Sequence, residues 1–173
     1  LYNIIGSAYL NMGRYGLAKE LFFKANKMSP GNIAVMNNLA NAYKNLDQIN
    51  LAEDLYNKII NKKPDYINAY VNFGNLKRDM NDFNAALELY KKACEINDKI
   101  PVVQYSLALA YQGTGNFKKA IEHAQKALLL DPKFTKADLL ISQSNKYTKV
   151  DYHYKSMNEK ALYLELNLDQ KSN

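Results

Sequence analysis

The chain has 173 residues, of which 47% are hydrophobic and 23% are charged, and it contains only seven glycines and four prolines. This composition excludes collagen-like, disordered and low-complexity proteins, and the scarcity of glycine and proline argues against an all-β chain. Lysine and arginine outnumber the acidic residues by 23 to 17, but no basic run exceeds two residues, so we expect no nucleic-acid binding. The longest apolar run, residues 127–130, is far too short to cross a membrane, so we expect no membrane insertion.

Two features of the sequence concern the cellular compartment of the protein and the length of the polypeptide to which it belongs. Cys94 is the single cysteine, so it cannot form an internal disulfide and nothing requires an oxidising compartment. We therefore expect a cytoplasmic protein. Because the first residue is Leu1 and not methionine, we also expect the chain to be a piece of a longer polypeptide.

Residues of the same kind recur every 34 positions from the start of the chain to residue 134. Prolines fall at Pro30, Pro64 and Pro132, and Asp98 takes the remaining place in that series. Three further series hold small residues and two hold aromatic residues. The small series are Gly6, Ala40, Gly74 and Ala108; Ala18, Ala52, Ala86 and Ala120; and Ala25, Ile59, Ala93 and Ala127, in which Ile59 is the one exception. The aromatic series are Tyr9, Tyr43 and Tyr111, and Phe22, Tyr56 and Tyr90. The pattern predicts four consecutive repeats, over residues 1–32, 33–66, 67–100 and 101–134.

Each repeat has the hydrophobic spacing of two amphipathic helices. In the second repeat, Met36, Leu39 and Tyr43 recur at steps of three or four residues, and a second such stripe runs from Leu51 to Ile59. The small residues are expected where the two helices cross, because backbones approach closely only where side chains are short. One such pair cannot bury both of its apolar faces, so the pairs must stack.

Beyond residue 134 the 34-residue register ends. We expect one helix over residues 135–147 and another over about 151–166, which together cap the array within residues 135–173, and a frayed segment over 169–173.

These repeats resemble the tetratricopeptide repeat family in their period and in their order of small, aromatic and proline residues. The resemblance covers residues 1–134 and implies an all-α, right-handed superhelical solenoid of antiparallel helix pairs, in which the first helices line a concave groove. Lys77, Ala124 and Asp98 depart from the family pattern, which suggests a looser junction around the third and fourth repeats.

No motif in the chain has the spacing of a catalytic, cofactor or metal site. His123 and His153 lie far apart, without ligands at metal-binding spacing, and Cys94 falls in a helix stripe where it reads as a small core residue. The pair Gly113 and Gly115 reads as a turn and not as a phosphate loop, because no Lys-Ser or Lys-Thr pair follows it. We therefore expect no catalytic residues, no cofactor and no metal, and a protein that is not an enzyme.

The predicted groove is lined by the inner faces of the first helices and of the cap helix. The residues expected to line it are Asn37, Asn38, Asn41, Lys44, Asn68, Val71, Asn72, Asn75, Arg78, Val102, Tyr105, Leu109, Gln112 and Leu139. Asparagine amides match the N–H and C=O groups of a peptide unit, so this row predicts a grip on the backbone of an extended peptide. An apolar ligand side chain is expected near Tyr105, and Lys44 and Arg78 would favour an acidic residue; alternatively, the amides are merely solvated, or a weak homodimer or the protein's own tail fills the apolar strip.

Two functions are open from the sequence. The first is a non-catalytic scaffold that binds a protein or extended peptide; Asn38 and Asn72 resemble the asparagine ladder of the O-linked N-acetylglucosamine transferase repeats. The second is the substrate-recruiting arm of a larger transferase, either sulfotransferase-like or a glycosyltransferase. The segment over residues 145–157 is similar to the one that joins repeats to a sulfotransferase-like domain in some bacterial proteins. The carboxylate clamp of chaperone-binding repeats is not expected, because Asn37, Val102 and Ser106 stand where that clamp has basic residues.

Overall fold

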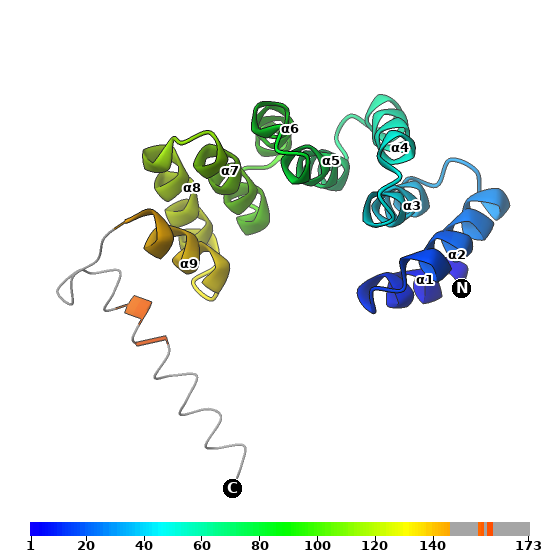
Figure 1. Ribbon diagram of the computed structural model, residues 1–173, viewed down its shortest axis with the longest axis horizontal. Coiled ribbons are helices and arrows are strands. Elements are labelled where there is room, and N and C mark those ends of the chain that lie inside the picture. The colour runs from blue at the N-terminus through cyan, green and yellow to red at the C-terminus, as the bar shows by residue number, and fades with distance from the viewer. Residues whose placement is uncertain (146–155, 158, 161–173) are drawn as a thin grey trace, which may run out of the picture. The chain divides into compact units, whose positions relative to one another are not determined.

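The computed structural model describes residues 1–145, 156, 157, 159 and 160, and within this part of the chain all regular structure is α-helical (Figure 1). The helices are α1 (Tyr2–Asn11), α2 (Tyr15–Met28), α3 (Ile33–Asn45), α4 (Ile49–Lys62), α5 (Ile67–Asp79), α6 (Phe83–Ile96), α7 (Pro101–Gly113), α8 (Phe117–Leu130) and α9 (Thr135–Ser144). Each of the four predicted repeat ranges contains one pair of helices. The described residues thus confirm the predicted all-α array of helix pairs.

The turn inside each helix pair is closed by one residue in the left-handed region. These residues are Gly13, Asp47, Asn81 and Gly115, with φ of 73°, 58°, 62° and 77°. The next backbone N–H donates to a carbonyl five residues back, as in Arg14 to Tyr9 at 2.9 Å, which satisfies an end carbonyl of the first helix. Glycine, asparagine and aspartate tolerate this conformation best, so the turn recurs at a fixed place in every repeat. Gly115 is a turn residue, as predicted.

The second helices end two residues before the positions of the proline series. Their last residues are Met28, Lys62, Ile96 and Leu130, and the series runs Pro30, Pro64, Asp98 and Pro132. Proline disfavours the helical conformation in the residue before it, which sets these ends. In the third repeat Asp98, a residue common in turns, takes the place of proline, and α6 still ends two residues before it.

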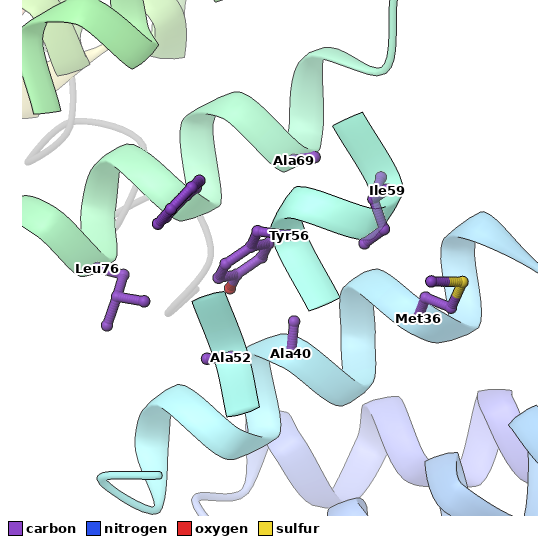
Figure 2. Close-up of a cluster of buried hydrophobic side chains, with 8 residues drawn as sticks. Met36, Ala40, Ala52, Tyr56, Ile59, Ala69 and Leu76 are labelled. Atoms are coloured by element: carbon purple, nitrogen blue, oxygen red, sulfur yellow. The ribbon is translucent and has the colours of Figure 1, made fainter. Parts of the chain in front are cut away.

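The core lies where the paired helices cross and where the next first helix covers them. Ala52, Tyr56 and Ile59 of α4 are fully buried between α3 and α5 (Figure 2). The Tyr56 ring stacks on Phe73 of α5, with ring centroids 5.4 Å apart. Gly6 shows why small residues are needed at the crossings, because a Cβ there would lie 2.7 Å from the ring of Phe22. The series that contains Gly6 and Gly74 therefore occupies crossing positions, because a Cβ at Gly74 would likewise overlap the ring of Tyr90.

The chain divides into two compact units, Leu1–Asp98 and Lys99–Asn173. The first unit contains α1 to α6, with cores around Phe22 and around Tyr56. The second contains α7, α8 and α9, whose core is built from alanines together with Leu140 and Ile141. The division falls at Asp98, which takes the proline position in the third repeat.

The cap is described only in part. The predicted helix over residues 135–147 is α9, which ends at Ser144. The helix predicted over 151–166, and the frayed segment over 169–173, lie almost wholly outside the described residues. Ser156, Met157, Glu159 and Lys160 are helical, and the Lys160 ammonium lies 2.8 Å from the buried Asp138 carboxylate of α9.

Candidate functional site

The first helices of unit Leu1–Asp98 present a row of polar side chains, which we call the amide face. Its members are Asn3, Ser7, Asn38, Asn41, Asn72 and Asn75. Hydrogen bonds join the row from one repeat to the next. The Asn38 amide donates to Asn3 Oδ1 at 3.0 Å and to Ser7 Oγ at 3.4 Å, and the Asn72 amide donates to Asn37 Oδ1 at 3.1 Å. The predicted asparagines therefore stabilise the stacking of neighbouring repeats.

Asn41 and Asn75 hold a second, different hydrogen bond within their own repeats. Asn41 Oδ1 accepts from the Tyr56 hydroxyl at 2.6 Å, and Asn75 Oδ1 accepts from the Tyr90 hydroxyl at 2.8 Å. Burial raises the pKa of both tyrosines well above the ordinary value, so the hydroxyls remain protonated donors. This orients both amides with their oxygens inward and their NH2 groups away from the tyrosine.

Comparison of the repeats with one another shows that the two positions vary together. The first repeat has Phe22 at the position of Tyr56 and Ser7 at the position of Asn41. The fourth repeat has Ala124 and Leu109 at these two positions. Asparagine stands at the second of these positions only in the two repeats whose ring carries a hydroxyl. The sequence reading missed this pairing, although the 34-residue alignment of the repeats contained the signal.

On the amide face, α3 and α5 each carry one side-chain acceptor and one side-chain donor that make no hydrogen bond within the described residues. The two groups lie a single helical turn apart. In the described part of the chain, no hydrogen bond uses the Oδ1 atoms of Asn38 and Asn72 or the NH2 groups of Asn41 and Asn75. All four side chains are half-buried, so they reach the surface while being held in place. A peptide unit offers the complementary N–H and C=O groups.

Three other predicted lining residues of this unit have different environments. Asn37 and Val71 are buried, at 5% and 8% exposure, because Asn37 accepts the bond from Asn72 and Val71 is packed in the interior. Asn37 thus helps to orient the amide of Asn72. Asn68 is exposed near the start of α5.

The predicted basic edge contains a shared carboxylate. Lys44 Nζ lies 3.1 Å from Asp79 Oδ2, and an Arg78 guanidinium nitrogen lies 3.0 Å from Asp79 Oδ1. Partial burial raises the pKa of Asp79, but hydrogen bonds from Arg78 and Lys44 outweigh it and the pKa is lowered. Asp79 therefore stays ionised and neutralises one of the two cations, which leaves a net charge of one at this edge.

The remaining predicted residues belong to unit Lys99–Asn173. Tyr105 is half-buried and packs edge-to-face on Phe134, with ring centroids 5.3 Å apart, and Leu109 is half-buried in the same cluster. Gln112 donates to Ser144 Oγ at 3.3 Å. Val102 and Leu139 are exposed, at 44% and 56%. This unit thus presents a more apolar first-helix surface than the amide face.

The second unit also contains a polar pair inside its helix pair. His123 takes the place held by Leu21, Leu55 and Leu89 in the other repeats. Its Nδ1 lies 2.8 Å from Oε1 of the buried Gln104, and its ring stacks on Tyr111. Burial lowers the pKa of His123; Lys126 and Lys119 lower it further, while Glu122 opposes them. The imidazole is therefore neutral at neutral pH and donates from Nδ1 to Gln104.

We expect this histidine to make unfolding pH-dependent. Its folded-state pKa lies below the ordinary 6.5, so the unfolded chain binds the proton more readily and stability is lost as pH falls below about 6.5. Measured by urea unfolding, the free energy of unfolding of the parent chain should fall more steeply from pH 8 to pH 5 than that of the His123→Phe variant. This variant keeps a ring against Tyr111. His153 is present in both chains, so its contribution to the pH dependence is common to the two profiles. Parallel pH profiles for the two chains would contradict this assignment.

The described residues contain no group of three or more His, Cys, Asp or Glu side chains placed to hold a metal ion. Among them there is also no helix with the length and hydropathy needed to cross a bilayer. Cys94 is half-buried. The segment over residues 145–157, whose resemblance suggested a transferase arm, lies outside the described residues except for Asn145, Ser156 and Met157.

Comparison with solved structures establishes the same fold in other proteins. The chain is similar to TTC0263, a tetratricopeptide protein of the thermophile Thermus thermophilus, with a TM-score of 0.76 and 20% identity over 83% of this chain and 79% of that one. It is similar to MamA from Desulfovibrio magneticus RS-1, with a TM-score of 0.70 and 22% identity over 98% and 94% of the two chains. It is also similar to PilF of Pseudomonas aeruginosa, with a TM-score of 0.76 and 20% identity over 83% and 65%.

Family models match most of the chain. Residues 9–73 and 101–134 match models of the tetratricopeptide repeat, and residues 74–115 match a model described as a TPR repeat. No curated protein sequence matches the chain significantly. With the 34-residue register, the helix pairs and the recurring turns, these matches show that the chain belongs to the tetratricopeptide repeat family.

Proposed function

We propose that this protein binds an extended peptide segment of a partner protein along the amide face of unit Leu1–Asp98. Its family and fold make it a protein-interaction scaffold in general terms. We expect the scaffold itself to be non-catalytic.

The observation that carries this proposal is the orientation of the four half-buried amides. On α3, Asn38 offers an oxygen and Asn41 offers an NH2 group; on α5, Asn72 and Asn75 do the same. Hydrogen bonds to neighbours already fix these side chains, so a ligand does not have to order them. Such preorganisation reduces the entropic cost of binding. Two equivalent donor–acceptor pairs on adjacent first helices suit two peptide units of one extended strand.

The charge at the nearby edge supports a modest preference for an acidic ligand residue. Among the described residues, Lys44 and Arg78 form ion pairs only with the carboxylate of Asp79, which leaves one positive charge uncompensated there. All three side chains are partly exposed, so the attraction is screened by salt and contributes little affinity. We therefore expect recognition to depend mainly on backbone hydrogen bonds.

The decisive experiment removes the donors and keeps the fold. In the double variant Asn41→Asp/Asn75→Asp, a carboxylate oxygen still accepts from each tyrosine, but the outward NH2 group becomes an oxygen. Peptides selected from a random library on the parent chain should bind the variant roughly tenfold more weakly, because each lost hydrogen bond contributes about 0.5–1.5 kcal/mol. Fluorescence anisotropy at fixed ionic strength measures the change.

A matched control separates the loss of donors from the added charge. Asn57→Asp/Asn84→Asp introduces the same two charges at exposed positions of α4 and α6, away from the amide face. It should bind the selected peptides as the parent does. If the two double variants bind alike, or if affinity depends on the ligand's side chains alone, the backbone-binding mode is wrong.

A further inference from the structure

The donor and acceptor groups of the amide face recur at the spacing of the first helices. Asn38 and Asn72 are equivalent in the 34-residue register, and so are Asn41 and Asn75. The backbones of α3 and α5 approach each other to within 8 Å between Cα atoms, and the Asn72 amide reaches Asn37 Oδ1 across the interval. Helices in such contact have axes about 8–10 Å apart. A ligand that uses both pairs must therefore present two equally oriented peptide units at about this separation.

The conformation of a peptide sets how often its peptide units return to the same orientation. In a β-strand the N–H and C=O groups point the same way again after two residues, which is about 6.6 Å along the chain. In a polyproline II helix they do so after three residues of about 3.1 Å each, which is about 9.3 Å. Of these two distances, the second matches the separation of about 8–10 Å between neighbouring first helices.

We propose that the ligand of the amide face is a proline-rich segment in the polyproline II conformation, with a residue other than proline at every third position. This inference rests on the proposed function. The N–H of that residue donates to the Oδ1 of Asn38 or Asn72, and the carbonyl of the same peptide unit accepts from Asn41 or Asn75. Proline has no N–H, so it cannot occupy the third position, but it suits the two positions between and holds the chain in the required conformation.

The fixed orientation of the amides favours a ligand whose conformation is also fixed. The Asn38 amide is held by Asn3, and the Asn41 oxygen accepts from Tyr56. When neither the surface nor the peptide has to be ordered, a small number of hydrogen bonds suffices for binding. In α1 the equivalent positions hold Ile4 and Ser7, so within unit Leu1–Asp98 the complete pair occurs on α3 and α5 alone. The binding unit is therefore two turns of polyproline II.

Three synthetic peptides of equal length test the three-residue period. The first repeats Pro-Pro-Ala four times, the second repeats Pro-Ala six times, and the third consists of twelve prolines. The second peptide has more N–H groups than the first, but they fall at every second residue, so a proline meets one of the two acceptors. We expect the Pro-Pro-Ala peptide to bind about three- to tenfold more tightly than the Pro-Ala peptide, and the all-proline peptide to bind most weakly. Fluorescence anisotropy at fixed ionic strength measures the three affinities.

Two variants of the protein show whether the Pro-Pro-Ala peptide lies on the amide face. Asn41→Asp/Asn75→Asp removes both donors and should lower the affinity for this peptide roughly tenfold. Asn57→Asp/Asn84→Asp adds the same charges at exposed positions of α4 and α6 and should leave the affinity unchanged. Circular dichroism and urea unfolding check that both variants keep the parent's fold.

A Pro-Ala peptide that binds as tightly as the Pro-Pro-Ala peptide, or more tightly, would show that the ligand does not follow a three-residue period and would overturn the inference. Equal binding by the all-proline peptide, absence of saturable binding by the Pro-Pro-Ala peptide, or equal binding by Asn41→Asp/Asn75→Asp and the parent would overturn it as well. The peptides selected from the random library keep the proposed function separate. If they still bind Asn41→Asp/Asn75→Asp more weakly, the backbone-binding mode stands and only the ligand's conformation is wrong; if they do not, both proposals fail.

Discussion

Replacing Gly74 with alanine is expected to lower the free energy of unfolding by about 1–3 kcal/mol. Gly74 lies in the interior of α5, where the helix crosses α6, and a Cβ at this position would overlap the ring of Tyr90. That ring is fully buried and its hydroxyl is bonded to Asn75, so it cannot move aside without disturbing a second contact. Urea unfolding followed by circular dichroism measures the loss.

Gly16→Ala is the matched control for this substitution. Gly16 is exposed in α2, and a Cβ there would meet no atom within 4 Å. The same exchange should therefore raise stability by about 0.5–1 kcal/mol, which is the ordinary gain of alanine over glycine in a helix. If both substitutions shift the unfolding curve in the same direction, the crossing at Gly74 is not as tight as the structure indicates.

Replacing Tyr56 with alanine is expected to lower the free energy of unfolding by about 3–5 kcal/mol, which is more than the loss expected for Gly74→Ala. The side chain has no exposed surface, stacks on Phe73 and donates to Asn41. Its removal opens a cavity between α3, α4 and α5 and leaves the Asn41 oxygen without its donor. At about 2–4 °C per kcal/mol for a chain of this size, the midpoint of thermal unfolding should fall by roughly 10 °C.

Tyr56→Phe separates packing from hydrogen bonding at the same position. The ring and its stacking on Phe73 remain, and only the bond to Asn41 is lost, so the expected cost is about 0.5–1.5 kcal/mol. Tyr90→Phe should cost a similar amount, because the Tyr90 hydroxyl makes the equivalent bond to Asn75. A Tyr56→Phe variant as unstable as Tyr56→Ala would show that the hydroxyl, and not the ring, dominates this contact.

The sequence by itself determined the local architecture of this protein. The 34-residue spacing of small and aromatic residues located the helix pairs, and it assigned Ala18, Ala52 and Ala86 to crossings where they are fully buried. It also showed that Gly115 belongs to a turn. These features depend on short-range rules, namely helix periodicity, proline sterics and the tolerance of glycine for positive φ, so they can be read from the order of residues alone.

Only the tertiary structure decided what the polar residues of the first helices do. The asparagines were predicted as one uniform row, yet Asn37 is buried, Asn38 and Asn72 bridge neighbouring repeats, and Asn41 pairs with Tyr56. Likewise, Lys44 and Arg78 share the carboxylate of Asp79. An amide or an ammonium can bond to any suitable group within about 3 Å, so its partner depends on how separate helices pack together. That packing brings residues 15 or 35 positions apart to hydrogen-bond distance, and the chemistry of one side chain does not reveal which of them it will meet.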